Sequence, residues 1–347
     1  MRYNPLGKTG LEISELCLGS MTFGTQTSQA EAFRQIDMAL DHGINIIDTA
    51  EMYPTNPLLK KTQGDTERII GNWVEQSGKR DDILIATKVS GEGHMNVRDG
   101  AAMSSATIFE AVETSLTSLK TETIDLYQLH WPNRGSYMFR KNWSFDATGQ
   151  SKTETLEHMN DVLEAMQTLV DDGKVRHFGL SNESAWGTAQ WLRISEDRGL
   201  PRVVSIQNEY SLLCRLFDLD LAELTHNEDV GLLAFSPIAT GLLTGKYHPD
   251  VTPEGSRRSF VADLGGRITP HVWPAIDAYL EIARKHGLNP VHMALAWCRT
   301  RPFMASAIFG ATTVPQLNEA LGSVDVVLSD EVLSDIQAVY RTHPMPI

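Results

Sequence analysis

Short runs of apolar and β-branched residues recur along the chain and alternate with longer stretches that have helical periodicity. Most of these runs are almost continuously hydrophobic, which is typical of parallel strands that are buried on both faces. Eight runs have this character: 16–21, 44–49, 83–89, 124–131, 175–181, 203–208, 232–237 and 305–310. The pattern therefore predicts eight parallel strands with helices between them.

The intervening stretches carry helix start and stop signals. After Ser28, which can cap a helix N-terminus, Phe33 and Ile36 fall on one helical face, and Gly43 ends the pattern. Eight strand-then-helix units favour an α/β fold, a closed (β/α)8 TIM barrel that forms one domain over residues 1–347. A doubly wound open sheet is the alternative.

Segments outside this repeat have their own places in the expected barrel. Residues 2–6 and 11–13 predict an N-terminal β-hairpin that closes the barrel floor, and a last helix is expected over 329–341, outside the barrel. Three stretches that follow strands are too long for simple connections: 54–65, 90–103 and 132–154. Loops that follow barrel strands gather at the C-terminal mouth, where barrel enzymes have their active sites.

The chain is acidic, because 44 Asp and Glu residues outnumber 30 Lys and Arg residues and give a net charge of −14. This excess argues against nucleic acid or an anionic membrane as a partner. No run of 18 apolar residues is present and the N-terminal residues lack a secretory signal, so no membrane span is expected. Cys17, Cys214 and Cys298 are widely spaced, which favours a reducing compartment, the cytoplasm, over a disulfide framework.

Four chemically active side chains lie at or just after the ends of predicted strands. Asp48 ends the second strand and Tyr53 follows it, while Lys88 and His130 close the third and fourth strands. Parallel strands of one barrel bring these ends around a single pocket. A lysine inside an apolar strand is costly to bury without a partner, and Asp48 is the obvious partner for Lys88.

This group has a chemical logic. A tyrosine with its usual pKa of about 10 is a poor proton donor at neutral pH. A neighbouring Lys88 ammonium favours the phenolate, so we expect it to lower the pKa of Tyr53 and make it a usable acid or base, while His130 orients a carbonyl. Taken singly, each residue has a simpler interpretation: Asp48 as a helix cap, Tyr53 as a loop aromatic, Lys88 as a surface lysine and His130 as a core histidine.

Other chemical templates are absent from the chain. No G-x-G-x-x-G follows the first strand, and no G-x-x-x-x-G-K-[ST] motif occurs, so the usual phosphate loops are missing. There is no H-E-x-x-H or paired C-x-x-C and the eleven histidines are scattered, so we expect no metal. A G-x-S-x-G elbow is also missing.

Five segments, in order along the chain, resemble successive motifs of the aldo-keto reductase family: 43–53, 67–71, 87–89, 126–132 and 173–182. The resemblance extends from Leu6 to about Leu321 and the combined set is highly specific. Within the family, the chain resembles the bacterial Tas-like branch and the β subunits of potassium channels. The resemblance implies a catalytic tetrad of Asp48, Tyr53, Lys88 and His130.

The resemblance also implies the reaction and its small-molecule partner. A nicotinamide cofactor gives a hydride to the carbonyl carbon of an aldehyde or ketone, or takes one from the alcohol, and Tyr53 is the proton donor in reduction. Tyr53 and His130 stabilise the developing oxyanion. Trp131 and other mouth aromatics suggest a pocket for a bulky or cyclic carbonyl, with packing among the loop aromatics themselves as the alternative.

Cofactor positions follow from the same resemblance. Ser181, Asn182 and Gln207 match residues that hydrogen-bond the nicotinamide carboxamide, although Ser181 and Asn182 could also be a helix N-cap. Phe235 matches an aromatic that stacks on nicotinamide. The remaining matches, along the pyrophosphate and adenosine, are Gly19, Met21, Thr22, Ser236, Pro237, Ile238, Gly241, Leu243, Lys246, Gly310, Thr312, Gln316 and Glu319.

The choice between NADPH and NADH depends on two positions. Arg257 matches a family arginine near the adenosine end, which a 2′-phosphate requires, and a solvated loop arginine is the alternative. The family usually has asparagine where this chain has Ala320, so one adenine hydrogen bond is expected to be missing. The resemblance therefore implies NADPH as the cofactor, with NADH possible.

Two further functional classes stay open. One is an NADPH-binding, redox-sensing regulatory subunit with slow turnover, because channel β subunits share the fold. The other is a barrel enzyme that uses a phosphate site without nicotinamide.

Overall fold

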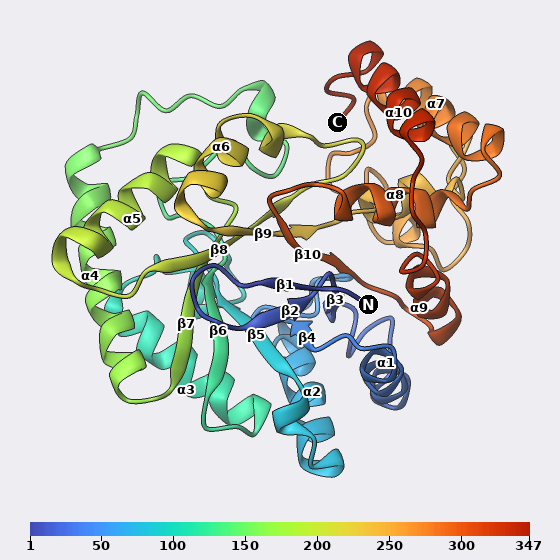
Figure 1. Cartoon of the computed structure of the whole chain (residues 1–347). Coiled ribbons are helices and arrows are strands. Elements are labelled where there is room, and N and C mark those ends of the chain that lie inside the picture. Colours follow the sequence, from blue (N-terminus) through green and yellow to red (C-terminus); the bar gives the residue numbers. More distant parts are fainter.

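The computed structural model describes all residues from Met1 to Ile347 and contains a closed barrel of eight parallel strands (Figure 1). The strand order around the barrel is β10-β3-β4-β5-β6-β7-β8-β9, so neighbours in the chain are neighbours in space. The strands are β3 (Leu16–Gly19), β4 (Ile46–Asp48), β5 (Leu84–Val89), β6 (Ile124–Leu129), β7 (Val175–Ser181), β8 (Val203–Glu209), β9 (Gly231–Phe235) and β10 (Met304–Phe309). The predicted barrel is confirmed, and closure excludes the open sheet.

Helices surround the strands (Figure 1). The α-helices are α1 (Gln29–Asp41), α2 (Asp65–Ser77), α3 (Ser105–Leu119), α4 (Lys152–Asp171), α5 (Ala185–Arg198), α6 (Asp220–Glu228), α7 (Val272–Lys285), α8 (Pro290–Arg299), α9 (Val314–Leu321) and α10 (Asp330–Thr342). Short 3-10 turns are η1 (Lys60–Thr62), η2 (Arg80–Asp82), η3 (Arg98–Gly100), η4 (Lys141–Trp143), η5 (Leu216–Asp218), η6 (Ala239–Thr244) and η7 (Arg257–Ser259). No helix is long and apolar enough to cross a membrane.

The predicted hairpin closes the barrel floor. Strands β1 (Tyr3–Pro5) and β2 (Glu12–Ser14) pair antiparallel and lie across one end of the barrel (Figure 1). Leu6 and Ile13 from this hairpin are buried against apolar side chains that fill the barrel interior. Gly7 has a φ of +55° and a Cβ there would lie 2.8 Å from the Val204 carbonyl oxygen, so the turn needs glycine.

Local signals place the first helix as predicted. The Ser28 hydroxyl accepts a hydrogen bond from the Glu31 amide at 3.3 Å, and Gly43 follows the helix with a φ of +84°. Apolar residues on the inner face, among them Ile36, are buried against the barrel. The cap, the apolar face and the glycine stop together fix where α1 begins and ends.

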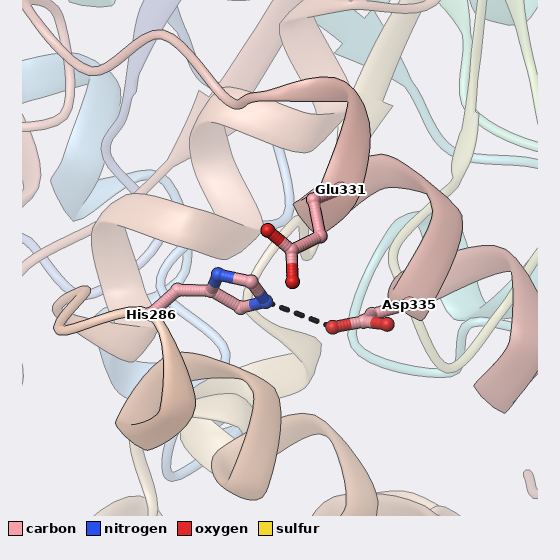
Figure 2. A group of neighbouring side chains, drawn as sticks. All are labelled: His286, Glu331 and Asp335. Atoms are coloured by element: carbon pink, nitrogen blue, oxygen red, sulfur yellow. Dashed lines mark hydrogen bonds and ion pairs between the residues drawn. The ribbon is translucent and has the colours of Figure 1, made fainter.

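The last helix lies outside the barrel, as expected, and packs on α7. Figure 2 shows the contact, in which Asp335 accepts from His286 Nε2 at 2.8 Å beside Glu331. These three side chains are close enough to share a metal ion. Lys285 Nζ, however, already pairs with Asp335 at 2.8 Å and Glu331 at 3.3 Å. We therefore interpret the group as an ion-pair network that holds α10 to α7.

Long segments at the mouth position the site. The three predicted long loops are present after β4, β5 and β6, and each contains one of the turns η1, η3 and η4. The sequence analysis missed a fourth and longer one, 236–271 after β9, which contains η6 and η7. Strand β4 is also shorter than the predicted run 44–49, since only Ile46–Asp48 pair with β5 and only Ile47 and Asp48 pair with β3.

One carboxyl is buried where α2 covers the barrel wall. Glu67 is 1% exposed, and the Thr87 hydroxyl of β5 donates to its Oε1 at 2.6 Å. Burial disfavours the carboxylate and raises the pKa of Glu67 to about 7, against which the hydrogen bond from Thr87 acts only in part. The side chain is therefore a buried acid that titrates near neutral pH.

We predict that Glu67 makes the fold less stable as pH rises. Because its pKa is higher in the fold than in the unfolded chain, its stabilising contribution is full below pH 4.5 and is lost as pH rises through about 7. The loss should approach about 3 kcal/mol, and Glu67→Gln should remove it. Urea unfolding at pH 5 and pH 8 measures the effect.

The matched control is Glu75→Gln, on the exposed side of the same helix, which should keep the wild-type pH dependence. An equal loss of stability between the two pH values in wild type and Glu67→Gln would show that Glu67 is not the responsible group.

Candidate active site

The barrel brings the charged strand ends together. Lys88, on β5, is fully buried, and its Nζ donates to Asp48 Oδ2 and to the Thr49 carbonyl oxygen, both at 2.7 Å. The parallel register places Asp48 beside Ala86, two residues before Lys88, so both side chains enter the barrel at nearly the same level. The predicted Lys88–Asp48 pair is confirmed.

Tyr53 and His130 complete the group. Lys88 Nζ lies 5.0 Å from the centre of the Tyr53 ring. The Tyr53 and His130 rings meet edge to face, with centroids 5.8 Å apart and planes at 77°. All four side chains are at most 9% exposed. The structure therefore gathers the four residues that the sequence predicted at the mouth of one barrel.

Burial and charge act in opposite directions on Lys88 and Tyr53. Burial lowers the pKa of Lys88, but Asp48 and Tyr53 outweigh it, so the pKa is raised and Lys88 stays an ammonium. Burial raises the pKa of Tyr53, and Lys88 lowers it without cancelling that effect. The expected net lowering is therefore wrong, because it neglected the burial of the phenol. Tyr53 stays protonated at neutral pH and is an acid.

His130 is neutral for related reasons. Burial, the Lys88 charge and nearby His94 together hold the pKa of His130 well below its usual value of 6.5. Its Nδ1 is buried and has no hydrogen-bond partner in the protein. A neutral imidazole carries one donor and one acceptor, so His130 can hydrogen-bond a substrate oxygen without adding a charge.

A carboxamide network supports the carboxylate from the far side of the barrel. Gln207 Nε2, on β8, donates to Asp48 Oδ1 at 2.7 Å and to Gln128 Oε1 at 3.2 Å. Both amide hydrogens of Gln207 are thus used, which leaves its oxygen to accept from a ligand. The sequence analysis missed Gln128, although its place inside β6 beside Lys88 in the register could have indicated it.

Ser181 and Asn182 face the same centre. Ser181 donates to the Gln207 carbonyl oxygen at 2.8 Å, and Asn182 Nδ2 donates to the His130 carbonyl oxygen at 2.9 Å. Asn182 Oδ1 is buried and has no partner. The N-cap of α5 is Ser184, whose hydroxyl accepts from Gly187 at 3.1 Å, so the helix-cap alternative for Ser181 and Asn182 is wrong.

The segment after β9 combines buried and partly exposed residues. Pro237 and Leu243 are buried, while Phe235, Ser236 and Ile238 are partly exposed. Positive φ angles at Ser236 (+56°) and Gly241 (+96°) turn the backbone sharply. A Cβ on Gly241 would lie 2.9 Å from Cε of Lys246, an exposed lysine without a carboxylate partner.

Two glycines meet where the barrel closes between β3 and β10. A Cβ on Gly310 would lie 3.2 Å from the Gly19 carbonyl oxygen, so the two chain segments approach closely. Thr22 reaches the Ala311 carbonyl oxygen at 3.4 Å. The Met21 carbonyl oxygen accepts from the backbone of the loop after β4 at 3.2 Å. The segments that carry Gly19, Met21, Thr22 and Gly310 therefore lie close together.

At the start of α9, neighbouring side chains hydrogen-bond to one another and to the backbone. Gln316 Oε1 accepts from the Thr312 amide and hydroxyl, both at 3.0 Å. Glu319 is exposed and accepts from Asn289 at 3.1 Å. Ala320, at the family's asparagine position, is 4% exposed and packs into the apolar core.

Arg257 differs from the arginines around it. It is half-buried and its guanidinium has no hydrogen-bond or ion-pair partner, whereas Arg258 pairs with Asp250. Burial lowers the pKa of Arg257 to about 10, with a further contribution from Arg267. Its charge also lowers the pKa of Tyr53, so Arg257 lies at the same mouth of the barrel as Tyr53.

Two other arginines join the mouth loops. Arg140 Nη1 from the loop after β6 binds Glu209 Oε2 at 2.6 Å. Arg267 Nε, from the segment after β9, binds Glu209 Oε1 at 2.7 Å. Both guanidiniums therefore share one carboxylate at the end of β8, whereas Arg257 has no carboxylate partner.

Trp131 lies beside His130. Its ring lies 4.9 Å from the His130 ring and 6.3 Å from the Phe139 ring, and its Nε1 donates to the Glu92 carbonyl oxygen at 3.1 Å. Tyr137 and Phe145 instead pack on each other, with centroids 6.2 Å apart. The mouth aromatics are therefore divided between the pocket and packing within the loop.

Comparisons with known proteins agree with this geometry. The model of the Aldo/keto reductase family matches residues 15–341. Protein tas of Escherichia coli (strain K12) is 42% identical over 352 residues, which cover 100% of this chain and 99% of that protein.

Two further relatives also span nearly the whole chain. An uncharacterized oxidoreductase, YrpG of Bacillus subtilis (strain 168), is 33% identical over 98% of this chain and 96% of its own length. A probable voltage-gated potassium channel subunit beta of Arabidopsis thaliana is 30% identical over 99% of this chain and 98% of its own length. With a family model that covers almost every residue and a matching barrel, the chain belongs to the aldo/keto reductase family.

Proposed function

We propose that this chain is an NADPH-dependent oxidoreductase that reduces aldehydes or ketones to alcohols by reversible hydride transfer. The observation that carries the proposal is the buried Lys88–Asp48 pair next to two neutral hydrogen-bonding groups, Tyr53 and His130. Membership of the aldo/keto reductase family supports oxidoreductase activity. The proposed setting is the cytoplasm, since all three cysteines are free.

Each side chain has a distinct role in the proposed reaction. Bound NADPH supplies the hydride. Tyr53, which is protonated at neutral pH, donates a proton to the carbonyl oxygen, and neutral His130 donates a hydrogen bond to the same oxygen. Lys88 stabilises the negative charge that Tyr53 acquires, and Asp48 positions Lys88. In alcohol oxidation the proton moves back to Tyr53.

Unpaired polar atoms at the mouth fit a nicotinamide carboxamide. Asn182 Oδ1 is a buried acceptor without a partner, and the amide hydrogens of Gln207 are both occupied, which leaves its oxygen to accept. The carboxamide of nicotinamide supplies two N–H donors, which suit two acceptors. Ser181 is bonded to the Gln207 backbone and so keeps the two amides in place.

The phosphates of the cofactor need cations, and this acidic chain has few that are unpaired. Lys246 and Arg257 have no carboxylate partner. Lys246 lies beside the sharply turned backbone at Gly241, which suits a pyrophosphate. Arg257 supports the choice of NADPH, because a 2′-phosphate would give its guanidinium the partner that it lacks. NADH remains the second cofactor of the proposal. Ala320 offers adenine no hydrogen bond, which affects both cofactors alike because they share the adenine.

A regulatory role is the second candidate, because relatives of the chain carry the name of potassium channel β subunits. An NADPH-binding sensor would bind the cofactor and turn over slowly, whereas a reductase consumes NADPH in steady state. Consumption of NADPH with a panel of carbonyl compounds therefore separates the two functions.

Tyr53→Phe tests the proton donor. Without the phenolic hydroxyl, kcat for carbonyl reduction should fall by about 100-fold to 10,000-fold, because the developing oxyanion receives no proton. NADPH binding, measured by the quenching of tryptophan fluorescence, should persist. Tyr127→Phe is the control, since this second buried tyrosine hydroxyl has no partner and should be dispensable. Unchanged turnover in Tyr53→Phe would refute the assignment.

Arg257→Ala tests the cofactor preference. Loss of the guanidinium should raise the Kd for NADPH by about 10-fold or more, the usual size of a hydrogen bond to a charged group, and change the Kd for NADH much less. Lys246→Ala is the comparison, because loss of a pyrophosphate contact should weaken the binding of NADPH and NADH alike. If Arg257→Ala weakens NADPH and NADH equally, the 2′-phosphate assignment is wrong.

A further inference from the structure

A half-buried histidine in the loop after β5, His94, has ring nitrogens without partners. Both ring nitrogens of His94 are shielded from solvent and neither has a hydrogen-bond partner. A neutral imidazole carries one donor and one acceptor, and shielding both without a partner is costly. Buried polar groups in folded proteins almost always have partners, so an imidazole with none suggests a ligand that supplies them.

His94 lies next to the proposed proton-transfer group. Its ring centroid is 6.3 Å from that of Trp131, which is 4.9 Å from that of His130. The two histidines are close enough that His94 lowers the pKa of His130. Trp131 thus lies near two imidazoles, that of His130 just after β6 and that of His94 in the loop after β5.

The loop that carries His94 is fixed to the catalytic loop. Arg98 binds both carboxylate oxygens of Glu51, with Nη1–Oε2 at 2.6 Å and Nη2–Oε1 at 2.8 Å. Glu51 also accepts from the Ser90 amide at 2.5 Å. At Gly91 a Cβ would lie 2.4 Å from the Trp131 ring, so the loop backbone packs directly on the indole. These contacts hold His94 at the mouth.

The carboxylate nearest to His94 does not serve as its partner. Glu51 is engaged by Arg98 and by the Ser90 amide and pairs with no histidine. Burial lowers the pKa of His94 below 6.5, with Glu51 and Arg98 acting in opposite directions. The ring is therefore neutral at pH 7 and offers a donor and an acceptor.

We propose that His94 is a specificity-determining residue that hydrogen-bonds the substrate, and that the pocket prefers carbonyl compounds with a second polar group near the reacting carbonyl. A hydroxyl group is the simplest such partner, because it both donates and accepts, as the neutral ring does. The inference rests on the proposed function, in which His130 and Tyr53 hold the carbonyl oxygen itself.

The test compares straight-chain aldehydes that carry a hydroxyl at C2, C3 or C4 with unsubstituted aldehydes of the same length. The quantity measured is the ratio of kcat/KM for each hydroxyaldehyde to that for its unsubstituted partner. Wild type should favour at least one hydroxyaldehyde, and His94→Leu should lower that ratio by about 10-fold, the effect of one lost hydrogen bond. His94→Gln, which keeps a donor and an acceptor, should retain most of the preference.

Damage to the loop should lower kcat/KM for the hydroxyaldehyde and for its unsubstituted partner by the same factor. The ratio of the two values then stays unchanged, so it separates a substrate contact from a structural role. Met95→Leu, at the exposed neighbouring position, should keep the wild-type ratio. Turnover with the same ratio in wild type and His94→Leu for every pair overturns this inference alone. Absence of NADPH oxidation by wild type with all the aldehydes overturns the proposed function and this inference with it.

Discussion

The buried ion pair between Lys88 and Asp48 is the constraint on which the rest of the mouth depends. An ammonium without solvent requires a compensating charge, and only a neighbouring strand of the same barrel can supply one at 2.7 Å. A buried ion pair of this kind adds little stability over a well-packed apolar pair, because both charges lose their hydration. Its presence inside the barrel therefore points to chemistry rather than to folding.

The pair also determines the charge state of its neighbours. Lys88 lowers the pKa of both Tyr53 and His130, while burial raises the first and lowers the second. The result for both groups is a neutral side chain with a hydrogen to donate. One cation, one anion and two neutral donors form a centre without excess charge, which suits an oxygen that becomes negative only during the reaction.

The second carboxylate oxygen of Asp48 extends this order across the barrel. The Gln207 side chain on β8 donates to this oxygen, and the backbone carbonyl oxygen of Gln207 in turn accepts from the Ser181 hydroxyl on β7. Asn182 continues the chain to the backbone of His130. Side chains from strands far apart in the sequence are thus connected through one set of hydrogen bonds, and the acceptor left over, Asn182 Oδ1, is the one that a carboxamide can use.

Local sequence patterns predicted those features that short stretches of the chain determine. Hydrophobic runs identified the eight strands, and a lysine within an apolar run indicated that Lys88 needs a partner. The sign of the Tyr53 pKa shift was not predictable in this way, because burial of the phenol depends on loops that close over it. The Arg98–Glu51 clamp was missed for the same reason, since it joins two loops 47 residues apart.

The distribution of paired and unpaired cations reconciles an acidic protein with an anionic cofactor. Net charge acts over long distances, where salt screens it within about 10 Å, so a charge of −14 does little to a ligand already at the mouth. What matters there is the nearest charge. Arg140 and Arg267 share the single carboxylate of Glu209, and Arg258 pairs with Asp250. Lys246 and Arg257 have no carboxylate partner, so these two cations of the segment after β9 are the ones free to pair with a phosphate.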